Sequence, residues 1–208
     1  MMNIKEAYDT WSSSYDMDEN LTRDLDATVT RRSLKGLRFE SILEIGCGTG
    51  KNTGLLSRIG ERVHAVDFSR GMLTIARGRV RAQNVSFAIV DLAITWPYAN
   101  RQFDLVTCNL VLEHLPGLAH VFAEAARSLR PQGRFFICEL HPFRQYQGKQ
   151  AVFQGGAQQI RIPACLHNLS EFLDGAAKNG LSLLELREWW HPDDRDETPR
   201  LVSFSFVK

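Results

Sequence analysis

The segment ILEIGCGTG at residues 42–50 places three glycines at alternate positions directly after a short apolar run. The apolar run predicts a buried β-strand, and a helix is predicted over residues 52–59. Because glycine has no Cβ, a ligand can reach the backbone of this strand-to-helix turn and meet its free N–H groups. We therefore expect a polar ligand here. A tight turn that needs positive φ at one position is the alternative explanation.

The chain from about residue 41 alternates short apolar runs with longer amphipathic ones. This pattern is typical of an α/β doubly wound fold, in which helices cover both faces of a parallel sheet. The predicted strands are 41–45, 62–66, 85–90, 103–108 and 133–140. The predicted helices between them are 52–59, 69–82 and 118–129.

The flanking regions have other patterns. Residues 5–15 and 21–36 are predicted helices, whereas residues 141–166 show no clear periodicity, which suggests a loop-rich insertion. A helix over 169–178 and two β-like runs follow, and the charged segment HPDDRDETP between those runs predicts an exposed turn. We expect one domain over residues 1–208. Its parts are a helical cap (1–38), a core (39–140), an insertion (141–168), and a C-terminal helix and hairpin (169–208).

Composition excludes several classes of protein. The net charge is +1, so no global field attracts nucleic acid. The sequence shows neither a signal-peptide pattern nor an apolar stretch long enough to span a membrane, and we expect a soluble cytoplasmic protein. The four cysteines form no CxxC pair or Cys/His cluster, so we predict no metal site.

An aspartate follows the glycine turn at the end of the next predicted strand. Asp67 ends the second predicted strand, 21 residues after Gly46, and its two carboxylate oxygens suit a pair of ribose hydroxyls. It could instead only cap the helix that begins near Ser69. A nicotinamide-binding turn would have a small third residue, but Lys51 stands at that position.

The turn motif GxGxG, Asp67, VSFAIVDL, FDLVTCNLVLEHL and LRPQGRFFICE occur in this order. Together they resemble the class I S-adenosylmethionine-dependent methyltransferases over roughly residues 40–140. The resemblance is closest to small-molecule enzymes such as the ubiquinone/menaquinone and glycine/sarcosine methyltransferases. Gln132 replaces the usual glycine of the last motif. The resemblance implies a Rossmann-like, mostly parallel seven-stranded sheet that ends in an antiparallel hairpin.

The resemblance also implies that the core (39–140) binds a cofactor and that the insertion (141–168) lies on the substrate side. The cofactor would be S-adenosyl-L-methionine, and a small-molecule acceptor would receive the methyl group by in-line displacement. The implied cofactor-binding residues are Tyr15, Glu44, Gly46, Cys47, Gly48, Gly50, Asp67, Phe68, Met72, Asp91, Leu92, Asn109 and Leu110. Of these, Glu44 could instead have a structural role and accept hydrogen bonds from N–H groups of the glycine turn.

Tyr8, Trp11 and Tyr15 lie along one face of the first predicted helix, where they could form a lid over the cofactor or simply pack. Tyr15 is our preferred candidate for a catalytic lid residue.

Histidines at the carboxyl edge of the predicted sheet are candidate bases. His114 follows the fourth strand and His141 the fifth, and a histidine can remove a proton near neutral pH. These histidines favour oxygen slightly over nitrogen or carbon as the methyl acceptor, although each could equally be non-catalytic. The candidate substrate-binding residues in the insertion are Arg144, Arg161 and His167, and a solvated loop would explain the arginines as well.

Two other functions stay open on the sequence alone. A nicotinamide-dependent oxidoreductase could use the same architecture, although Lys51 argues against it. A non-catalytic regulatory or partner protein that binds S-adenosylmethionine would show the same motifs.

Overall fold

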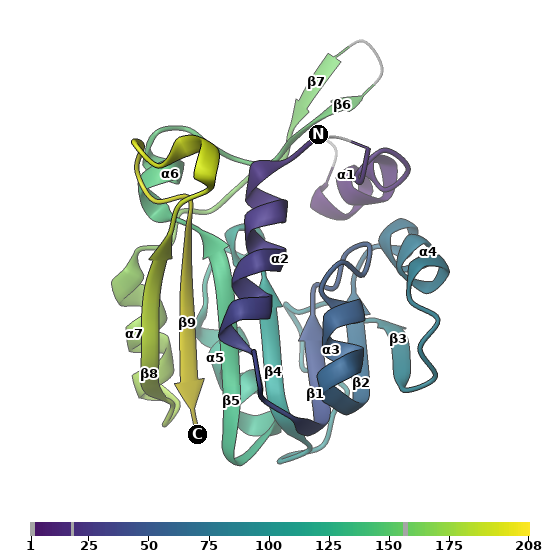
Figure 1. Ribbon diagram of the computed structural model, residues 1–208, viewed down its shortest axis with the longest axis vertical. Coiled ribbons are helices and arrows are strands. Elements are labelled where there is room, and N and C mark those ends of the chain that lie inside the picture. Colours follow the sequence, from purple (N-terminus) through teal and green to yellow (C-terminus); the bar gives the residue numbers. More distant parts are fainter. Residues whose placement is uncertain (1–2, 18, 156–157) are drawn as a thin grey trace.

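The computed structural model describes residues 3–17, 19–155 and 158–208. A seven-stranded sheet with the order β3-β2-β1-β4-β5-β9-β8 runs through the molecule (Figure 1). β9 pairs antiparallel with β5 and β8, whereas the other neighbours pair parallel, which confirms the predicted doubly wound α/β fold with an antiparallel C-terminal hairpin. The strands are β1 (Phe39–Ile45), β2 (Gly60–Asp67), β3 (Val85–Ile89), β4 (Phe103–Asn109), β5 (Leu129–Leu140), β8 (Ser182–Trp189) and β9 (Leu201–Val207).

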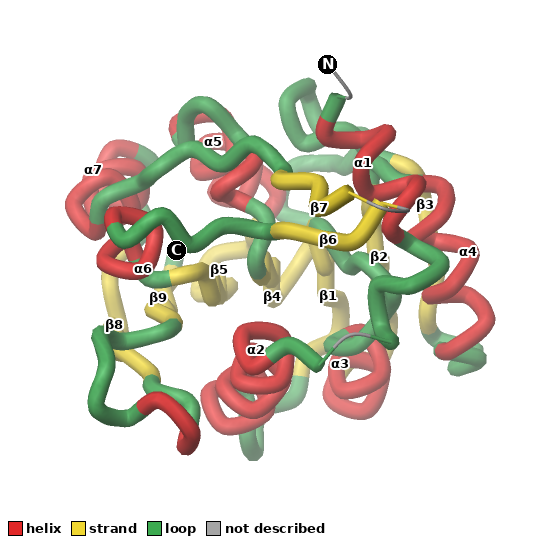
Figure 2. Tube along the Cα trace, turned by 90° about the horizontal axis from the view of Figure 1, so that it is seen from above, coloured by secondary structure: helices red, strands yellow, loops and turns green. Residues whose placement is uncertain are grey.

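Helices cover both faces of this sheet. α2 and α3 lie on one face, and α5 and α7 lie on the other (Figure 2). α1 packs against α4, above the carboxyl ends of the parallel strands (Figure 1). The helices are α1 (Ile4–Trp11), α2 (Leu21–Ser33), α3 (Thr53–Ile59), α4 (Arg70–Arg79), α5 (Ala119–Ser128), α6 (Pro142–Tyr146) and α7 (Leu169–Lys178), with the 3-10 turns η1 (Leu112–His114) and η2 (Pro192–Asp194).

The central strands are buried on both faces, as their continuous apolar runs predict. Ile42 packs among side chains of α2 and α3, while its neighbour Leu43 belongs to the cluster under α5 and α7. Both have no exposed surface. Alternate residues of one strand therefore belong to two separate hydrophobic layers.

The order of the strands determines where a ligand can bind. β1 and β4 are neighbours, and the chain proceeds outward from β1 to β2 and β3 on one side and from β4 to β5 on the other. Loops that leave β1 and β4 at their carboxyl ends therefore diverge and leave a crevice between them. The glycine turn after β1 and the segment after β4 border this crevice.

Two local predictions hold only in part. The insertion contains helix α6 and a hairpin of β6 (Val152–Gly155) and β7 (Gln158–Arg161), which are too short to produce a readable periodicity. The turn between β8 and β9 is not fully exposed, because Asp194 is buried against the guanidinium groups of Arg144 and Arg200.

No helix in the described part of the chain is long and apolar enough to cross a bilayer.

Candidate functional site

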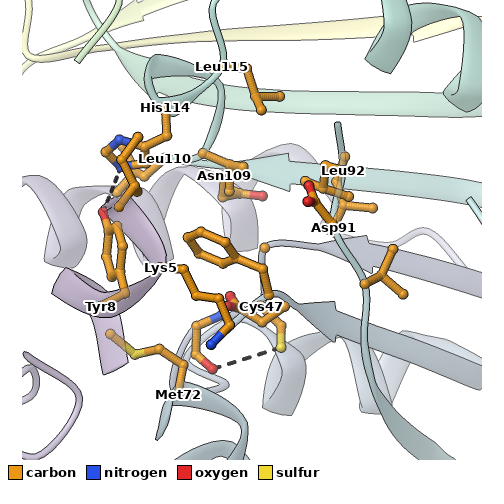
Figure 3. Close-up of a pocket in the computed structure, with 18 of the residues that line it drawn as sticks. Lys5, Tyr8, Cys47, Met72, Asp91, Leu92, Asn109, Leu110, His114 and Leu115 are labelled. Carbon is orange, nitrogen blue, oxygen red and sulfur yellow. Dashed lines mark hydrogen bonds between the residues drawn. The ribbon is translucent and has the colours of Figure 1, made fainter. Parts of the chain in front are cut away.

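A cavity of about 730 Å³ opens at the carboxyl edge of the sheet. Its walls come from α1, α2, the glycine turn, the start of α4, the ends of β2, β3 and β4, and η1 (Figure 3). Predicted residues that line it are Tyr15, Glu44, Gly46, Cys47, Gly48, Asp67, Phe68, Met72, Asp91, Leu92, Asn109, Leu110 and His114. The fold thus brings residues from five separate segments to one concave site.

The glycine turn has the backbone that its sequence predicts. Gly46, Gly48 and Gly50 have φ values of +69°, +52° and +81°, which L side chains rarely adopt. A Cβ at Gly46 would lie 2.1 Å from Cγ2 of Val111, so this glycine also permits a close contact with the segment after β4. Gly50 lies outside the cavity lining and approaches Ala76 of α4 instead.

Asp67 joins the glycine turn to the start of α4. Its Oδ2 accepts the backbone N–H of Gly48 at 2.9 Å, and its Oδ1 accepts that of Ser69 at 2.8 Å. Burial raises the pKa of this carboxyl group to about 6, even though both hydrogen bonds act in the opposite direction. Each carboxylate oxygen retains accepting capacity, so the side chain can bind hydroxyl groups while it also caps the chain before α4.

The floor of the cavity carries two further buried acids. Glu44 accepts a hydrogen bond from the Thr53 hydroxyl at 2.5 Å, and burial raises its pKa to about 8. Asp26 accepts amide N–H groups of Asn109 at 2.6 Å and Asn52 at 2.8 Å, and burial raises its pKa as well. Neutral donors therefore hold both acids, so a cationic ligand group bound here would favour their ionised forms.

Sequence reasoning missed Asp26 and its neighbour Arg23, which both line the cavity from α2. A signal was present, because Arg23, Asp26 and Thr30 recur at intervals of three and four residues. That spacing places them on one face of the helix, and all three are buried. A row of polar residues on one buried face of a helix indicates a binding site.

Tyr8 and His114 contact each other at one side of the cavity (Figure 3), with Tyr8 Oη 2.6 Å from His114 Nε2. The other ring nitrogen, Nδ1, lies 3.3 Å from the carbonyl oxygen of Pro163, which can only accept. Nδ1 therefore carries the hydrogen, and Nε2 accepts from the Tyr8 hydroxyl. Burial lowers the pKa of His114 and so favours the neutral imidazole.

Tyr15, the lid residue preferred from the sequence, also lines the cavity but is held differently. The Arg23 guanidinium carbon lies 4.1 Å from the centre of its ring. Trp11, between the two tyrosines, stacks on Phe153 of β6 with ring centres 5.2 Å apart. Of the three aromatics in this stripe, Tyr8 is the one whose hydroxyl contacts a candidate base, which the helical spacing did not reveal.

The structure places four other predicted site residues outside the cavity lining. His141 is fully buried, and its Nε2 lies 2.9 Å from a Glu188 oxygen. Arg144 forms an ion pair with Asp194 at 2.8 Å and another with Glu197. Their chain segment turns away from the crevice after β5 to form α6.

The remaining two are His167 and Arg161. His167 Nε2 lies 3.1 Å and 2.9 Å from the carbonyl oxygens of Leu112 and Leu115, so it stabilises the turn η1. Arg161 is exposed on β7. The positive charges expected to bind an acceptor are therefore in ion pairs or at the surface.

Residues 43–137 match the protein family described as a methyltransferase domain. This part of the chain is a methyltransferase domain. The matched region begins in β1 and ends in β5, so it contains the glycine turn, Asp67, Asp91 and His114. The resemblance to the class I S-adenosylmethionine-dependent methyltransferases, first seen in the sequence motifs, is confirmed.

Curated relatives and solved structures agree with this methyltransferase domain. Methyltransferase GfsG of Streptomyces halstedii is 32% identical over 152 residues, which are 71% of this chain and 54% of that protein. A ubiquinone biosynthesis O-methyltransferase of Coxiella burnetii is 28% identical over 157 residues, 72% of this chain and 67% of that protein. The chain thus spans about half the length of the first of these relatives.

The fold itself is shared with a crystal structure of an S-adenosylmethionine-dependent methyltransferase from Mesorhizobium loti. The TM-score is 0.72 at 18% identity, and the match covers 91% of this chain and 100% of the other. At this identity, the comparison supports the methyltransferase fold and not a particular substrate.

Proposed function

We propose that the protein transfers a methyl group from S-adenosyl-L-methionine to a hydroxyl group of a small-molecule acceptor. The observation that carries the proposal is that one cavity contains both the glycine turn with Asp67 and the Tyr8–His114 pair. A nucleoside site and a proton-accepting pair in the same cavity suit a group transfer between two bound molecules.

The residues present fit this cofactor. Asp67 would hold the ribose hydroxyls, and Asp91 with Leu92 would contact the adenine, which Phe68 and Met72 would flank. The positively charged end fits the floor, where Glu44 and Asp26 are buried with neutral donors. When bound, S-adenosyl-L-methionine would supply an electrophilic methyl group on a sulfonium.

The acceptor end of the cavity is largely apolar. Ile4, Leu115, Pro116 and Pro163 line it beside Tyr8 and His114. Such walls suit a small, mostly apolar molecule with one hydroxyl group near the Tyr8–His114 pair. The Coxiella burnetii relative is named as a ubiquinone biosynthesis O-methyltransferase, which supports oxygen as the acceptor atom.

The Tyr8–His114 pair can accept the proton of that hydroxyl. With an acceptor hydroxyl placed against Tyr8, its proton would pass to the Tyr8 oxygen while the Tyr8 proton passes to Nε2 of His114. Glu113 Oε1 lies 3.8 Å from this Nε2 and would stabilise the imidazolium that forms. His114 is the base in this scheme, and Tyr8 contacts the acceptor.

The test is formation of S-adenosylhomocysteine from S-adenosyl-L-methionine with a panel of neutral phenols, amines and carbon acids, followed by mass spectrometry. We expect turnover with a hydroxyl acceptor, a loss of about 100-fold or more in His114→Asn, and a smaller loss in Tyr8→Phe. His64→Gln is the matched control, because His64 lies on β2 outside the cavity.

Each other outcome has a defined meaning. Methylation of amines or carbon acids alone would contradict the hydroxyl assignment. Tight binding of S-adenosylhomocysteine without turnover across the panel would favour a non-catalytic binding protein. Binding of NAD in its place would overturn the cofactor assignment.

A further inference from the structure

The N-terminal segment (residues 3–17) contains the dipeptide Tyr-Asp twice, at Tyr8–Asp9 and at Tyr15–Asp16. The two units are seven residues apart, and both tyrosines line the cavity. The side chain of each aspartate forms hydrogen bonds with a neighbouring element of the cavity wall. Each unit therefore combines a cavity-lining ring with a carboxylate that contacts the wall.

Asp9 binds the N-terminus of α4. Its Oδ1 accepts the Ser69 hydroxyl at 2.6 Å and the backbone N–H of Gly71 at 3.0 Å. Ser69 is itself the N-cap of α4 and accepts the Met72 N–H, so Asp9 adds a second cap from a different helix. Burial raises the pKa of Asp9, but hydrogen bonds from Lys5, Ser69 and Gly71 outweigh it and lower the pKa to about 2.

The approach of the two elements at this point is close. A Cβ at Gly71 would lie 2.4 Å from the Ser12 hydroxyl oxygen and 3.0 Å from the Asp9 carbonyl oxygen. α4 begins at Arg70, two residues after Phe68, which lines the cavity. Asp9 thus attaches the segment beside a residue that would contact the cofactor.

Asp16 binds the glycine turn and the end of α4. Its Oδ2 lies 2.6 Å from Nη2 of Arg79, and its Oδ1 accepts the Thr49 hydroxyl at 3.2 Å. Nη1 of Arg79 donates to the Thr49 carbonyl oxygen at 3.1 Å. Asp16, Arg79 and Thr49 therefore form a closed set of contacts between the N-terminal segment, α4 and the turn.

The aromatic side chains of the segment make different attachments. Trp11 stacks on Phe153 of the β6–β7 hairpin, and Tyr8 contacts His114 after β4. Those contacts hold the segment to the acceptor side of the cavity. The two carboxylates hold it to the cofactor side.

We propose that Asp9 and Asp16 are positioning residues that hold Tyr8 and Tyr15 over the cofactor and set how long the cofactor stays bound. The identity of the cofactor rests on the proposed function, whereas the attachment of the segment does not. Release of the cofactor requires both carboxylates to separate from α4 and from the glycine turn. The Asp16–Arg79 pair is partly exposed, so dissolved salt weakens it.

The first experiment measures amide hydrogen exchange in residues 3–17 of the ligand-free protein. Asp9→Asn and Asp16→Asn should exchange at least tenfold faster there than the wild type, with unchanged exchange in β1 and β4. Asp174→Asn, an exposed carboxylate on α7, is the matched control and should behave as the wild type.

The second experiment measures dissociation of S-adenosylhomocysteine by stopped-flow fluorescence of the tryptophans. We expect a rate at least tenfold faster in both variants. In the wild type, the rate should rise between about 50 mM and 500 mM sodium chloride. Asp16→Asn should lose that salt dependence, and Asp16→Glu, which retains the charge, should restore it in part.

The outcomes separate the two proposals. Unchanged exchange in residues 3–17 of Asp9→Asn and Asp16→Asn would overturn the positioning role, as would wild-type dissociation rates in both. If one variant does not fold, the other decides the question. If the wild-type protein does not bind S-adenosylhomocysteine, the proposed function fails, and hydrogen exchange still decides whether the carboxylates hold the segment.

Discussion

The backbone N–H of Gly48 donates a hydrogen bond of 2.9 Å to Oδ2 of Asp67. One carboxylate therefore ties the turn after β1 to the end of β2, the two places from which a nucleoside would be held. The Asp67 carboxyl group must remain ionised to accept hydrogen bonds from hydroxyl groups with both of its oxygens. Three of its properties, namely position, burial and charge, can be tested by substitution and by pH.

Replacing Asp67 with alanine should weaken binding of S-adenosylhomocysteine at least tenfold, or about 1.4 kcal/mol, because charge-assisted hydrogen bonds to the ribose would be lost. Isothermal titration calorimetry measures this change. Asp174→Asn serves again as the control. A dissociation constant equal to that of the wild type, in a variant that folds, would mean that the ribose is held elsewhere.

The affinity for S-adenosylhomocysteine should also depend on pH. Burial raises the pKa of Asp67 to about 6, so the carboxylate gains a proton as the pH falls through that value. We expect the dissociation constant to rise between pH 7.5 and pH 5. Asp67→Asn, which cannot titrate, should bind more weakly at pH 7.5 and lack this part of the pH dependence.

The stability of the ligand-free protein should decrease as the pH rises from about 5 to 8.5. Burial raises the pKa of Glu44 to about 8, and that of Glu139 to about 8. Between an ordinary glutamate pKa near 4.3 and these values, the folded state binds more protons than the unfolded state, so the free energy of unfolding falls with pH. Each group contributes a slope of at most about 1.4 kcal/mol per pH unit.

Urea unfolding at several pH values measures that slope. Glu44→Gln keeps the size of the side chain but removes its titration, so the slope should become smaller. A slope identical to that of the wild type would show that Glu44 titrates normally in the folded protein.

Gly46→Ala should destabilise the protein and abolish cofactor binding. The added Cβ would meet Val111 at 2.1 Å, and the φ of +69° costs an L-residue about 1 kcal/mol or more. Gly78→Ala is a matched control, because Gly78 lies inside α4, where a Cβ would meet nothing within 4 Å. There the change should stabilise the protein slightly. Equal effects at both sites, seen in urea unfolding, would contradict this assignment.

Arg144→Met should lower the free energy of unfolding by about 3 kcal/mol, because it leaves the buried Asp194 with an incomplete set of partners. The dissociation constant of S-adenosylhomocysteine should stay within about twofold of the wild type. Arg161→Ala, at an exposed position of β7, should change neither quantity. Loss of acceptor binding without loss of stability in Arg144→Met would return Arg144 to the substrate site.

Much of the fold could be predicted because it depends on local signals. The start of the strand Val85–Ile89 and both ends of the helix Leu169–Lys178 agree with the prediction. The helix ends where Asn179 and Gly180 follow, residues that favour the end of a helix. By contrast, α6 and the β6–β7 hairpin are too short for their periodicity to be read.

The positions of some candidate site residues could also be predicted from local signals, and those of others could not. The glycine turn and Asp67 were predictable because each lies at the end of a strand, and the carboxyl ends of parallel strands meet at one edge of the sheet. His141 and Arg144 follow β5 in the same way but turn into α6, so position after a strand was not sufficient. The direction of a chain after its strand depends on long-range contacts such as the Arg144–Asp194 ion pair.

The sequence alone determined the class of fold, the open backbone at Gly46 and Gly48, and the acid that faces it, because apolar periodicity, missing Cβ atoms and strand ends are local properties. Only the tertiary structure decided that Tyr8, not Tyr15, contacts His114, that Asp26 reaches the cavity floor, and that Asp9 caps α4. The reason is physical. Tyr8 and His114 are 106 residues apart, and their contact depends on how the N-terminal segment packs over the carboxyl edge of the folded sheet.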